Sequence, residues 1–285
     1  MEEKLPVIRF KKAAREKLAN QLGIAIGAFL LEMAIAAFAF VIIAMALSGT
    51  VLAPLLQELM SVSDEKSLIE LEEQLFEMTN TPRYIITSEL ISAFMGALFA
   101  TLSTGYIRIC LKISRTEKPA IKDLFYVYKN NPDRVILIYL MTFLVQFVIG
   151  LPGDQLSYYV QKNPENTGLY LIYMVVITLS VVITVLFALS VSQTFFIFVD
   201  DPSTPVMDVF KKSFEMMKGN KGRLFALAVS FLGWIGLCLL TCGTLLIWVV
   251  PYTEMAMTEF YRNIKGEPLW VTKSNYQGPV EPEEE

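Results

Sequence analysis

Windows of about 20 consecutive apolar residues recur along this 285-residue chain, and they restrict its fold more than any other feature. A helix needs roughly 20 apolar residues to cross a hydrocarbon core of ~30 Å, because it rises ~1.5 Å per residue. The windows lie near residues 21–48, 84–112, 134–150, 169–198, 223–241 and 244–264. With 54% hydrophobic residues and a mean hydropathy of +0.49, they predict an all-α, polytopic membrane protein with six transmembrane helices.

The basic residues fall almost entirely on alternate loops. Of the 24 Lys and Arg residues, all but Lys66, Arg83 and Lys162 lie before the first window, between residues 108 and 134, between residues 211 and 223, or from the end of the sixth window onward. Lysine and arginine near span ends stay on the cytoplasmic side. The distribution therefore predicts an even number of spans in the plasma membrane, with both termini in the cytoplasm.

Three basic, amphipathic segments each lead into an odd-numbered window. They contain "RFKKAAREKLANQLGIAIGAFLL", "AIKDLFYVYKNNPDRVILIYLM" and "PVMDVFKKSFEMMKGNKGRLFALAVSF". Asn20, Asn131 and Asn220 each stand just before the apolar run, where a turn is expected. The pattern predicts three repeated hairpins, each preceded by a cytoplasmic amphipathic helix at the membrane interface.

The third segment has the best-defined interfacial helix. Thr204 is expected to cap it, with Pro205 at its first position and Gly219 after its end. Its apolar stripe comprises Val206, Val209, Phe210, Phe214 and Met217, and its opposite face carries Lys211, Lys212 and Lys218. Such a helix is expected to lie in the headgroup plane and contact anionic lipids through its lysines. The alternative is a solvated helix that docks a partner protein.

The chain divides into one membrane domain and a tail. Residues 1–264 are expected to form a single domain, in which 50–83 make an acidic extracytoplasmic loop. In that loop Ser63 is expected to cap a short helix with Leu68, Leu71, Leu75 and Phe76 along one edge. Residues 265–285, rich in Pro, Gly and Glu, predict a disordered cytoplasmic tail.

The composition argues against catalysis and against a bound cofactor. The chain has no histidine, so acid–base chemistry near neutral pH would need a carboxylate with a raised pKa. No nucleophile elbow, phosphate loop, zinc or haem motif is present. Cys238 and Cys242 are expected to share a helix face, but nothing completes a metal site. We expect no enzyme, cofactor, metal or nucleic-acid partner.

Two carboxylates lie deep within the predicted spans. Glu32 is ~16 Å into the first span and Glu254 ~15 Å into the sixth. A charge at such a depth costs about 2.5–3.5 kcal/mol on insertion scales. Pro251 leaves the carbonyl of Ile247 without its helical donor. These features predict an intramembrane polar site of Glu32, Glu254 and Pro251. The alternative is a structural role, with each carboxyl bonded to polar groups on neighbouring helices.

A second pair of charges is matched in depth near the cytoplasmic end. Arg108 lies ~6 Å from the end of the second span and Glu259 ~7 Å from the end of the sixth. Because the two side chains are expected at similar depth, they predict a structural ion pair.

The C-terminal half carries a long, ordered run of motifs. They are Asp200 with Pro202, Lys212 with Ser213, Met217 to Gly219, Arg223 to Phe225, Ser230 to Trp234, Gly243, Trp248 to Tyr252, and Phe260 with Tyr261. This run resembles the prokaryotic integral-membrane family called domain of unknown function 975. With looser matches in the first two spans, the resemblance covers most of residues 8–264. The stretch "LPGDQLSYYVQKNPENTG" departs from it as a longer outer loop.

The resemblance implies no activity and no site residues. A fainter likeness, to the membrane domains of some glycerophosphodiester phosphodiesterases, implies lipid-linked work. Two functions therefore stay open. One is a scaffold or accessory protein that binds lipids or partner membrane proteins. The other is a small transporter or permeation pathway for a small or lipid-like solute, using the midplane carboxylates.

Overall fold

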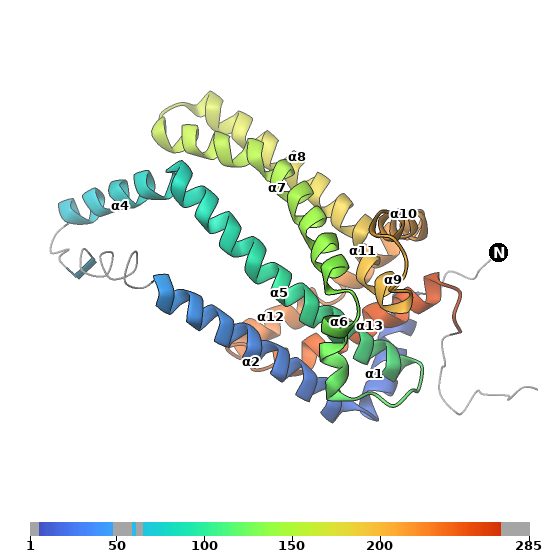
Figure 1. Cartoon of the computed structure of the whole chain (residues 1–285). Coiled ribbons are helices and arrows are strands. Elements are labelled where there is room, and N and C mark those ends of the chain that lie inside the picture. The colour runs from blue at the N-terminus through green and yellow to red at the C-terminus, as the bar shows by residue number, and fades with distance from the viewer. Residues whose placement is uncertain (1–5, 48–58, 61–64, 269–285) are drawn as a thin grey trace, which may run out of the picture. The chain divides into compact units, whose positions relative to one another are not determined.

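The computed structural model describes residues 6–47, 59–60 and 65–268, and every regular element in these ranges is a helix (Figure 1). The protein is therefore all-α in its described part, as predicted. The longer helices are α1 (Val7–Ala19), α2 (Leu22–Leu47), α4 (Glu65–Thr79), α5 (Pro82–Ser114), α7 (Pro132–Lys162), α8 (Thr167–Val191), α10 (Val206–Met217) and α13 (Leu246–Ile264). The shorter ones are η2 (Ile121–Phe125), α6 (Tyr126–Lys129), α9 (Thr194–Asp200), α11 (Lys221–Val229) and α12 (Leu232–Leu240).

Five helical segments of the described chain are long and apolar enough to cross a membrane. They are Leu22–Met45, Arg83–Ser114, Pro132–Lys162, Thr167–Asp200 and Lys221–Leu240. They overlap the first five predicted windows, which supports the expected class of helical membrane protein. The sixth window corresponds to α13, which is not among the five. Three charged residues lie along its 19-residue length: Glu254, Glu259 and Arg262.

The chain forms two compact units. Unit 1 comprises Met1–Leu30, Leu102–Pro132 and Leu186–Glu285, and unit 2 comprises Leu31–Thr101 and Asp133–Val185. Unit 1 contains α1, η2, α6 and α9 to α13. Unit 2 contains α4 and most of α7 and α8.

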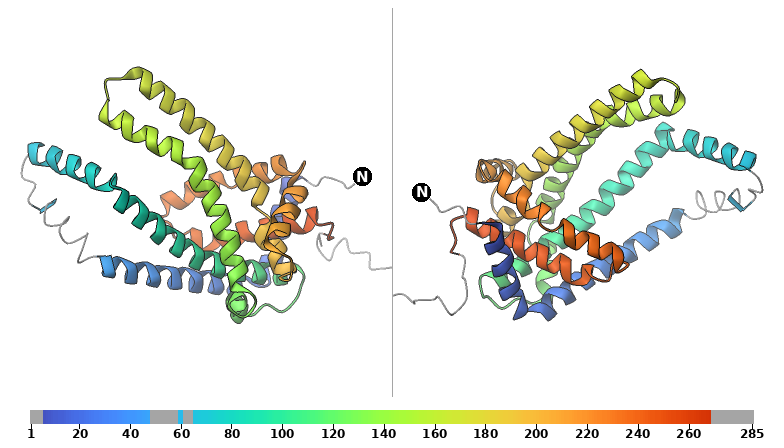
Figure 2. Two further views of the ribbon diagram at one scale, coloured as in Figure 1. Left: turned by 45° about the horizontal axis from the view of Figure 1, so that its top comes forward. Right: turned by 180° about the vertical axis from the view of Figure 1, so that it is seen from behind.

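In unit 1, α1 packs against α13 (Figure 2, α1 dark blue and α13 orange-red). The apolar face of α1, formed by Phe10, Ala13, Ala14 and Leu18, is buried. The rings of Phe10 and Phe260 meet edge to face, with centroids 5.6 Å apart. The apolar stripe of the first amphipathic segment is thus covered by protein. Arg9, Lys12 and Arg15 are exposed, whereas Lys17 contacts Glu259 of α13.

The third apolar segment is longer than predicted. Its window was expected to end at residue 150 and to be followed by a long outer loop, but α7 continues through Pro152 to Lys162. Only residues 163–166 connect it to α8. At the end of α7, Asn163 donates its side-chain amide to the carbonyl of Tyr159. A proline removes one helical hydrogen bond without ending the helix when the residues on both sides keep helical geometry.

The fourth apolar segment is broken near its end, where a single helix was expected over 169–198. α8 ends at Val191 and α9 begins at Thr194. Ser213 of α10, which is fully buried, satisfies the backbone at this break. Its hydroxyl donates to the carbonyl of Ser190 at 2.8 Å and accepts from the amide of Gln193 at 3.3 Å. These two hydrogen bonds connect α10 to the break between α8 and α9.

The three asparagines expected at turns do occupy turns. Asn20 follows α1, Asn131 precedes α7 and Asn220 precedes α11. Their backbones differ, with φ of −80° at Asn20, +56° at Asn131 and −112° at Asn220. The position of the turn therefore recurs along the chain, while its conformation does not.

A close approach in unit 1 requires glycine at position 105. A Cβ atom there would lie 1.9 Å from the carbonyl oxygen of Leu124 in η2. Because the obstacle is backbone, it cannot rotate away as a side chain would. Gly105 thus allows η2 to lie directly on α5.

We expect Gly105→Ala to lower the free energy of unfolding by about 1–3 kcal/mol or more, because the added methyl overpacks this contact. Thermal unfolding of the purified protein in detergent measures the change. Gly27→Ala is the control, since a Cβ at Gly27 meets nothing within 4 Å. It should leave the stability unchanged or raise it by about 0.5–1 kcal/mol. Equal effects of the two substitutions would contradict the close approach.

Candidate functional site

Charged residues gather where helices of unit 1 end. Lys17 lies near the end of α1, Arg115 directly after α5, Asp200 at the end of α9, and Glu259 and Arg262 in the last turns of α13. The helices of unit 1 thus bring these polar ends together. Two connected clusters result.

The Glu259 cluster consists of Lys17, Ser114, Glu259 and Arg262. Lys17 Nζ lies 2.9 Å from Glu259 Oε1, and the Ser114 hydroxyl donates to the same oxygen. Arg262 Nη1 donates to the Ser114 hydroxyl at 2.7 Å and to its carbonyl at 2.8 Å. Glu259 and Ser114 are fully buried. Burial lowers the pKa of Lys17, although the attraction of Glu259 opposes this.

The Asp200 cluster consists of Arg115, Asp200, Tyr261, Lys265 and Glu267. Arg115 holds Asp200 by two hydrogen bonds of 2.7 and 3.1 Å, the bidentate geometry that suits a carboxylate. Lys265 Nζ and the Tyr261 hydroxyl donate to Asp200 Oδ2 at 2.6 and 2.7 Å. The hydrogen bond to Asp200 raises the pKa of Arg115. Arg115, Lys265 and Tyr261 thus all donate to the carboxylate of Asp200.

Glu267 connects the two clusters. It lies 2.6 Å from Arg115 Nη2 and 2.8 Å from Arg262 Nε. Burial would raise the pKa of Glu267, but the hydrogen bonds from Arg115, Arg262 and Lys265 outweigh burial and lower it to about 2. The first residues of the predicted disordered tail therefore contact this network. Residues 269–285 lie outside the described chain.

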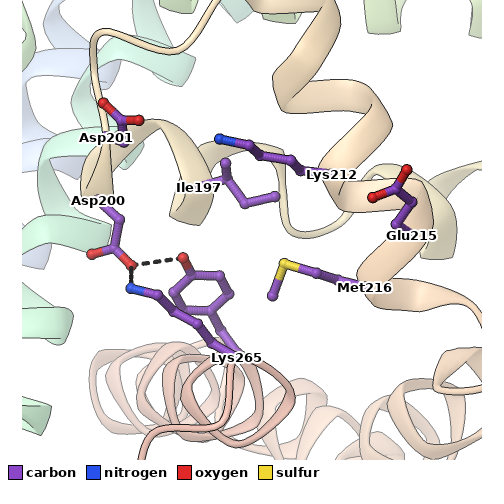
Figure 3. Close-up of a pocket in the computed structure, with 8 residues that line it drawn as sticks. Ile197, Asp200, Asp201, Lys212, Glu215, Met216 and Lys265 are labelled. Atoms are coloured by element: carbon purple, nitrogen blue, oxygen red, sulfur yellow. Dashed lines mark hydrogen bonds and ion pairs between the residues drawn. The ribbon is translucent and has the colours of Figure 1, made fainter.

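A pocket of about 280 Å³ opens beside the Asp200 cluster (Figure 3). Lys212 reaches from α10 toward Asp201, while the Asp200–Lys265 pair lies across the pocket. The other lining residues are Ile197, Glu215, Met216 and Tyr261. Lys212 also donates to the hydroxyl of Thr204 at 3.2 Å. The pocket is lined by both acidic and basic side chains. Asp200 and Lys265 already form an ion pair with each other there.

The three lysines predicted to contact lipid are all exposed, two on α10 and one directly after it. Lys211 pairs weakly with Asp208 at 3.2 Å, Lys212 lines the pocket, and Lys218 follows the helix end. The predicted cap was wrong, because α10 begins at Val206 with no side-chain cap. Thr204 instead donates to Asp201 at 2.7 Å, and hydrogen bonds from Ser203 and Thr204 lower the pKa of Asp201 to about 2. Gly219 has φ +79°, as its predicted role after the helix requires.

The midplane residues are placed in different units. Glu32 of α2 is 3% exposed and belongs to unit 2, whereas Glu254 of α13 is half-buried and belongs to unit 1. A shared site of the two carboxyls stays a prediction. Pro251 is buried, but α13 begins at Leu246, so the carbonyl of Ile247 lies in the first turn of this helix. The helical hydrogen bond that the proline removes is therefore near the start of α13 and not in the middle of a span.

The expected ion pair of Arg108 with Glu259 is replaced by other partners. Glu259 binds Lys17 and Arg262, while Arg108 Nε lies 3.7 Å from Asp123 and its guanidinium lies 3.6 Å from the centre of the Tyr126 ring. Depth alone suggested the pair, but η2 and α6 fold onto the end of α5 and bring Asp123 to Arg108. The sequence offered one signal for this, a glycine three residues before Arg108.

Asp123 has a second partner, Lys112, whose Nζ lies 2.8 Å from Asp123 Oδ1. Burial alone would raise the pKa of Asp123, but the hydrogen bonds from Lys112 and from the amide of Ala120 lower it. Asp123 therefore holds two cations of α5.

The three cysteines form no disulfide with one another in the described structure. Cys110 and Cys238 are buried, and Cys242 is exposed. Cys238 and Cys242 do not share a helix face as expected, because α12 ends at Leu240 and Cys242 has φ +48°. Among the residues described, no group of three or more acids, cysteines or histidines is placed to hold a metal ion.

These observations define a helical membrane protein in which ion pairs join the helix ends of one unit. A family model described as "Protein of unknown function (DUF975)" matches residues 5–268. The chain belongs to this family, as its C-terminal motifs suggested. Comparison with curated proteins found no match, and comparison with solved structures found none either.

We expect Glu259→Gln to destabilise the protein by about 3–5 kcal/mol, because Lys17 and Arg262 then lose a buried counter-charge. Thermal or denaturant unfolding in detergent measures this. Asp208→Asn removes the exposed pair with Lys211 and should change the stability by less than about 1 kcal/mol. If Glu259→Gln proved as harmless as Asp208→Asn, Glu259 would not be the centre of a stabilising cluster.

Proposed function

We propose that this protein is a membrane scaffold or accessory protein that binds anionic lipids, and through them partner membrane proteins, at a basic surface of unit 1. The proposal assigns it no reaction and no cofactor. It is carried by one observation: three separate segments of unit 1 each expose basic side chains next to large apolar ones.

The three segments combine charge and apolar surface in the same way. Basic residues alone would suit any solvated surface, whereas exposed apolar side chains between them suit a bilayer interface. α1 exposes Ile8 with Arg9 and Lys12. η2 and α6 expose Ile121, Phe125 and Tyr128 with Lys122 and Lys129. α10 exposes Met207 and Phe214, with Lys211 and Lys218 beside them.

On α10 the exposed residues form a regular stripe. Met207, Lys211, Phe214 and Lys218 follow one another by four, three and four positions, the spacing of one helical face. Met207 is 55% exposed and Phe214 is 44% exposed. The opposite face, with Val209, Ser213 and Met217, is buried in unit 1. The buried face fixes the helix on unit 1. Lys211 and Lys218 therefore already face outward, and the helix does not have to become ordered before they bind a ligand.

The finer topology is part of the proposal. Six spans, as three hairpins with both termini in the cytoplasm of a cell bounded by the plasma membrane, follow from the distribution of basic residues. α13 would be the sixth span. Its charged residues Glu259 and Arg262 meet partners within unit 1, which lowers the cost of burying them in a membrane.

Labelling with a membrane-impermeant maleimide tests this topology in a Cys242→Ser background, which removes the exposed native thiol. Asn163→Cys, in the connection between α7 and α8, should react from outside intact cells. Lys118→Cys, in the exposed loop after α5, should react only after lysis. Labelling of both from outside, or the reverse pattern, would refute the proposed orientation.

The lipid-binding surface is tested by native mass spectrometry of delipidated protein with added phosphatidylglycerol. Lys211→Gln combined with Lys218→Gln should weaken binding by roughly tenfold or more, because each lysine near an anionic surface contributes about 1 kcal/mol. Arg83→Gln with Lys162→Gln is the matched control, since both are exposed and belong to unit 2. Equal losses of phosphatidylglycerol in the two double variants, or no loss in the Lys211 and Lys218 variant, would count against the proposal.

The alternative is a small transporter or permeation pathway. It is favoured by the burial of the Glu32 side chain within an apolar helix. An ionisable side chain there is costly in free energy, and such residues commonly line solute or ion pathways. Solute uptake into proteoliposomes that Glu32→Gln and Glu254→Gln each abolish would favour the transporter over the scaffold.

A further inference from the structure

Unit 2 contains a larger pocket than the one beside Asp200. It has a volume of about 720 Å³, within the range of about 300–1,000 Å³ that small-molecule sites occupy. Its walls are Thr79 and Asn80 at the end of α4, the first two turns of α5 and the second half of α7. Figure 1 shows the short connection and the bend between α4 and α5.

Two close contacts hold these walls together. A Cβ atom on Gly96 of α5 would lie 1.8 Å from the hydroxyl oxygen of Tyr139, so the tip of the Tyr139 side chain in α7 lies directly on α5 at this glycine. Nearer the pocket, the rings of Phe76 in α4 and Tyr158 in α7 stack with centroids 5.7 Å apart. The pocket lies beyond the first contact and beside the second, which gives it fixed walls.

The charged residues that line the pocket are both acids, Glu89 of α5 and Asp154 of α7. Neither carboxylate forms a hydrogen bond or ion pair with another residue of the described chain. Two basic residues lie near in sequence, Arg83 and Lys162, but neither lines the pocket. Lys162 Nζ instead lies over the Tyr158 ring, 4.9 Å from its centre. The pocket therefore carries negative charge that no described cation neutralises.

The remaining lining suits a ligand with an apolar part. Tyr84, Phe147 and Leu151 supply aromatic and aliphatic surface, and the amides of Gln155 and Gln161 supply hydrogen-bonding groups. An aromatic ring attracts a cation over its face, by about 0.5–1 kcal/mol at an exposed site. Tyr84 is 39% exposed, so its ring is accessible to a ligand. Carboxylates together with aromatic rings are the combination that organic ammonium groups prefer.

We propose that this pocket binds an organic ammonium compound, with Glu89 and Asp154 as counter-charges and Tyr84 as an aromatic wall. An anionic ligand would be repelled by both carboxylates. A divalent metal would need more oxygen ligands than two carboxylates supply, since calcium takes six to eight. The ammonium group can belong to a free amine or to an ethanolamine or choline lipid headgroup. The inference is independent of the proposed lipid surface, because it rests on unit 2 alone.

Isothermal titration calorimetry of the full-length protein in detergent tests the proposal, with choline and spermidine as free amines. The neutral isostere of choline, 3,3-dimethylbutan-1-ol, has the same shape without the charge. We expect the wild type to bind at least one of the amines and to bind the isostere at least about tenfold more weakly. Native mass spectrometry with phosphatidylethanolamine and phosphatidylcholine forms the second arm. Lipid retention without binding of free amines would assign the ammonium group to a headgroup.

Glu89→Gln combined with Asp154→Asn should weaken binding of the ligand identified by about tenfold or more, and Tyr84→Leu should weaken it to a smaller extent. The controls are Glu165→Gln and Tyr170→Leu, an exposed acid and an exposed tyrosine of unit 2 that do not line the pocket. The isostere comparison uses the wild type alone, so it holds even if a variant fails to fold. Equal binding of choline and its isostere, calcium binding at these acids in place of amines, or no binding in either arm would overturn the proposal.

Discussion

The buried carboxylate of Glu259 is the interaction on which the organisation of unit 1 depends. Taking a carboxylate out of water costs several kcal/mol, which only close partners can offset. Here the partners come from α1, from the end of α5 and from α13 itself, so satisfying one charge positions three helices. The Asp200 cluster then adds α9 through Arg115 and Glu267. Hydrophobic contacts such as that of Phe10 with Phe260 bring α1 to α13, but the ion pairs determine which residues meet.

The same principle separates the polar groups that stabilise the fold from those available for binding. The charges of the Glu259 and Asp200 clusters are directed at one another, so they are poor candidates for recognition. The lysines of α10 and the acids Glu89 and Asp154 are different, because their surroundings leave most of their charge unneutralised. The charged residues thus fall into an internal set that joins helices and an outward set that is available to other molecules.

The class of fold could be predicted from the sequence because apolar length and loop charge act locally. The five long apolar helices overlap the predicted windows, and the asparagine turns lie where expected. Which polar side chains pair with one another could not be predicted in the same way. Arg108 was assigned to Glu259 by depth, but the close approach at Gly105 brings Asp123 to it instead. The break between α8 and α9 depends on Ser213, which is distant in sequence. Such pairings follow from packing, which a single sequence does not record.

The contact between Lys17 and Glu259 has a consequence for biogenesis. These residues are 242 positions apart, so the pair cannot form until almost the whole chain has been made. At about 5–20 residues per second, synthesis of the intervening chain takes on the order of 12–50 seconds. Throughout that interval the apolar face of α1 lacks its final partner, and Ser114 lacks Glu259 from the time it is made. α1 therefore needs another surface in the meantime, and the headgroup layer, which suits its arginines and lysines, can supply one until α13 is made.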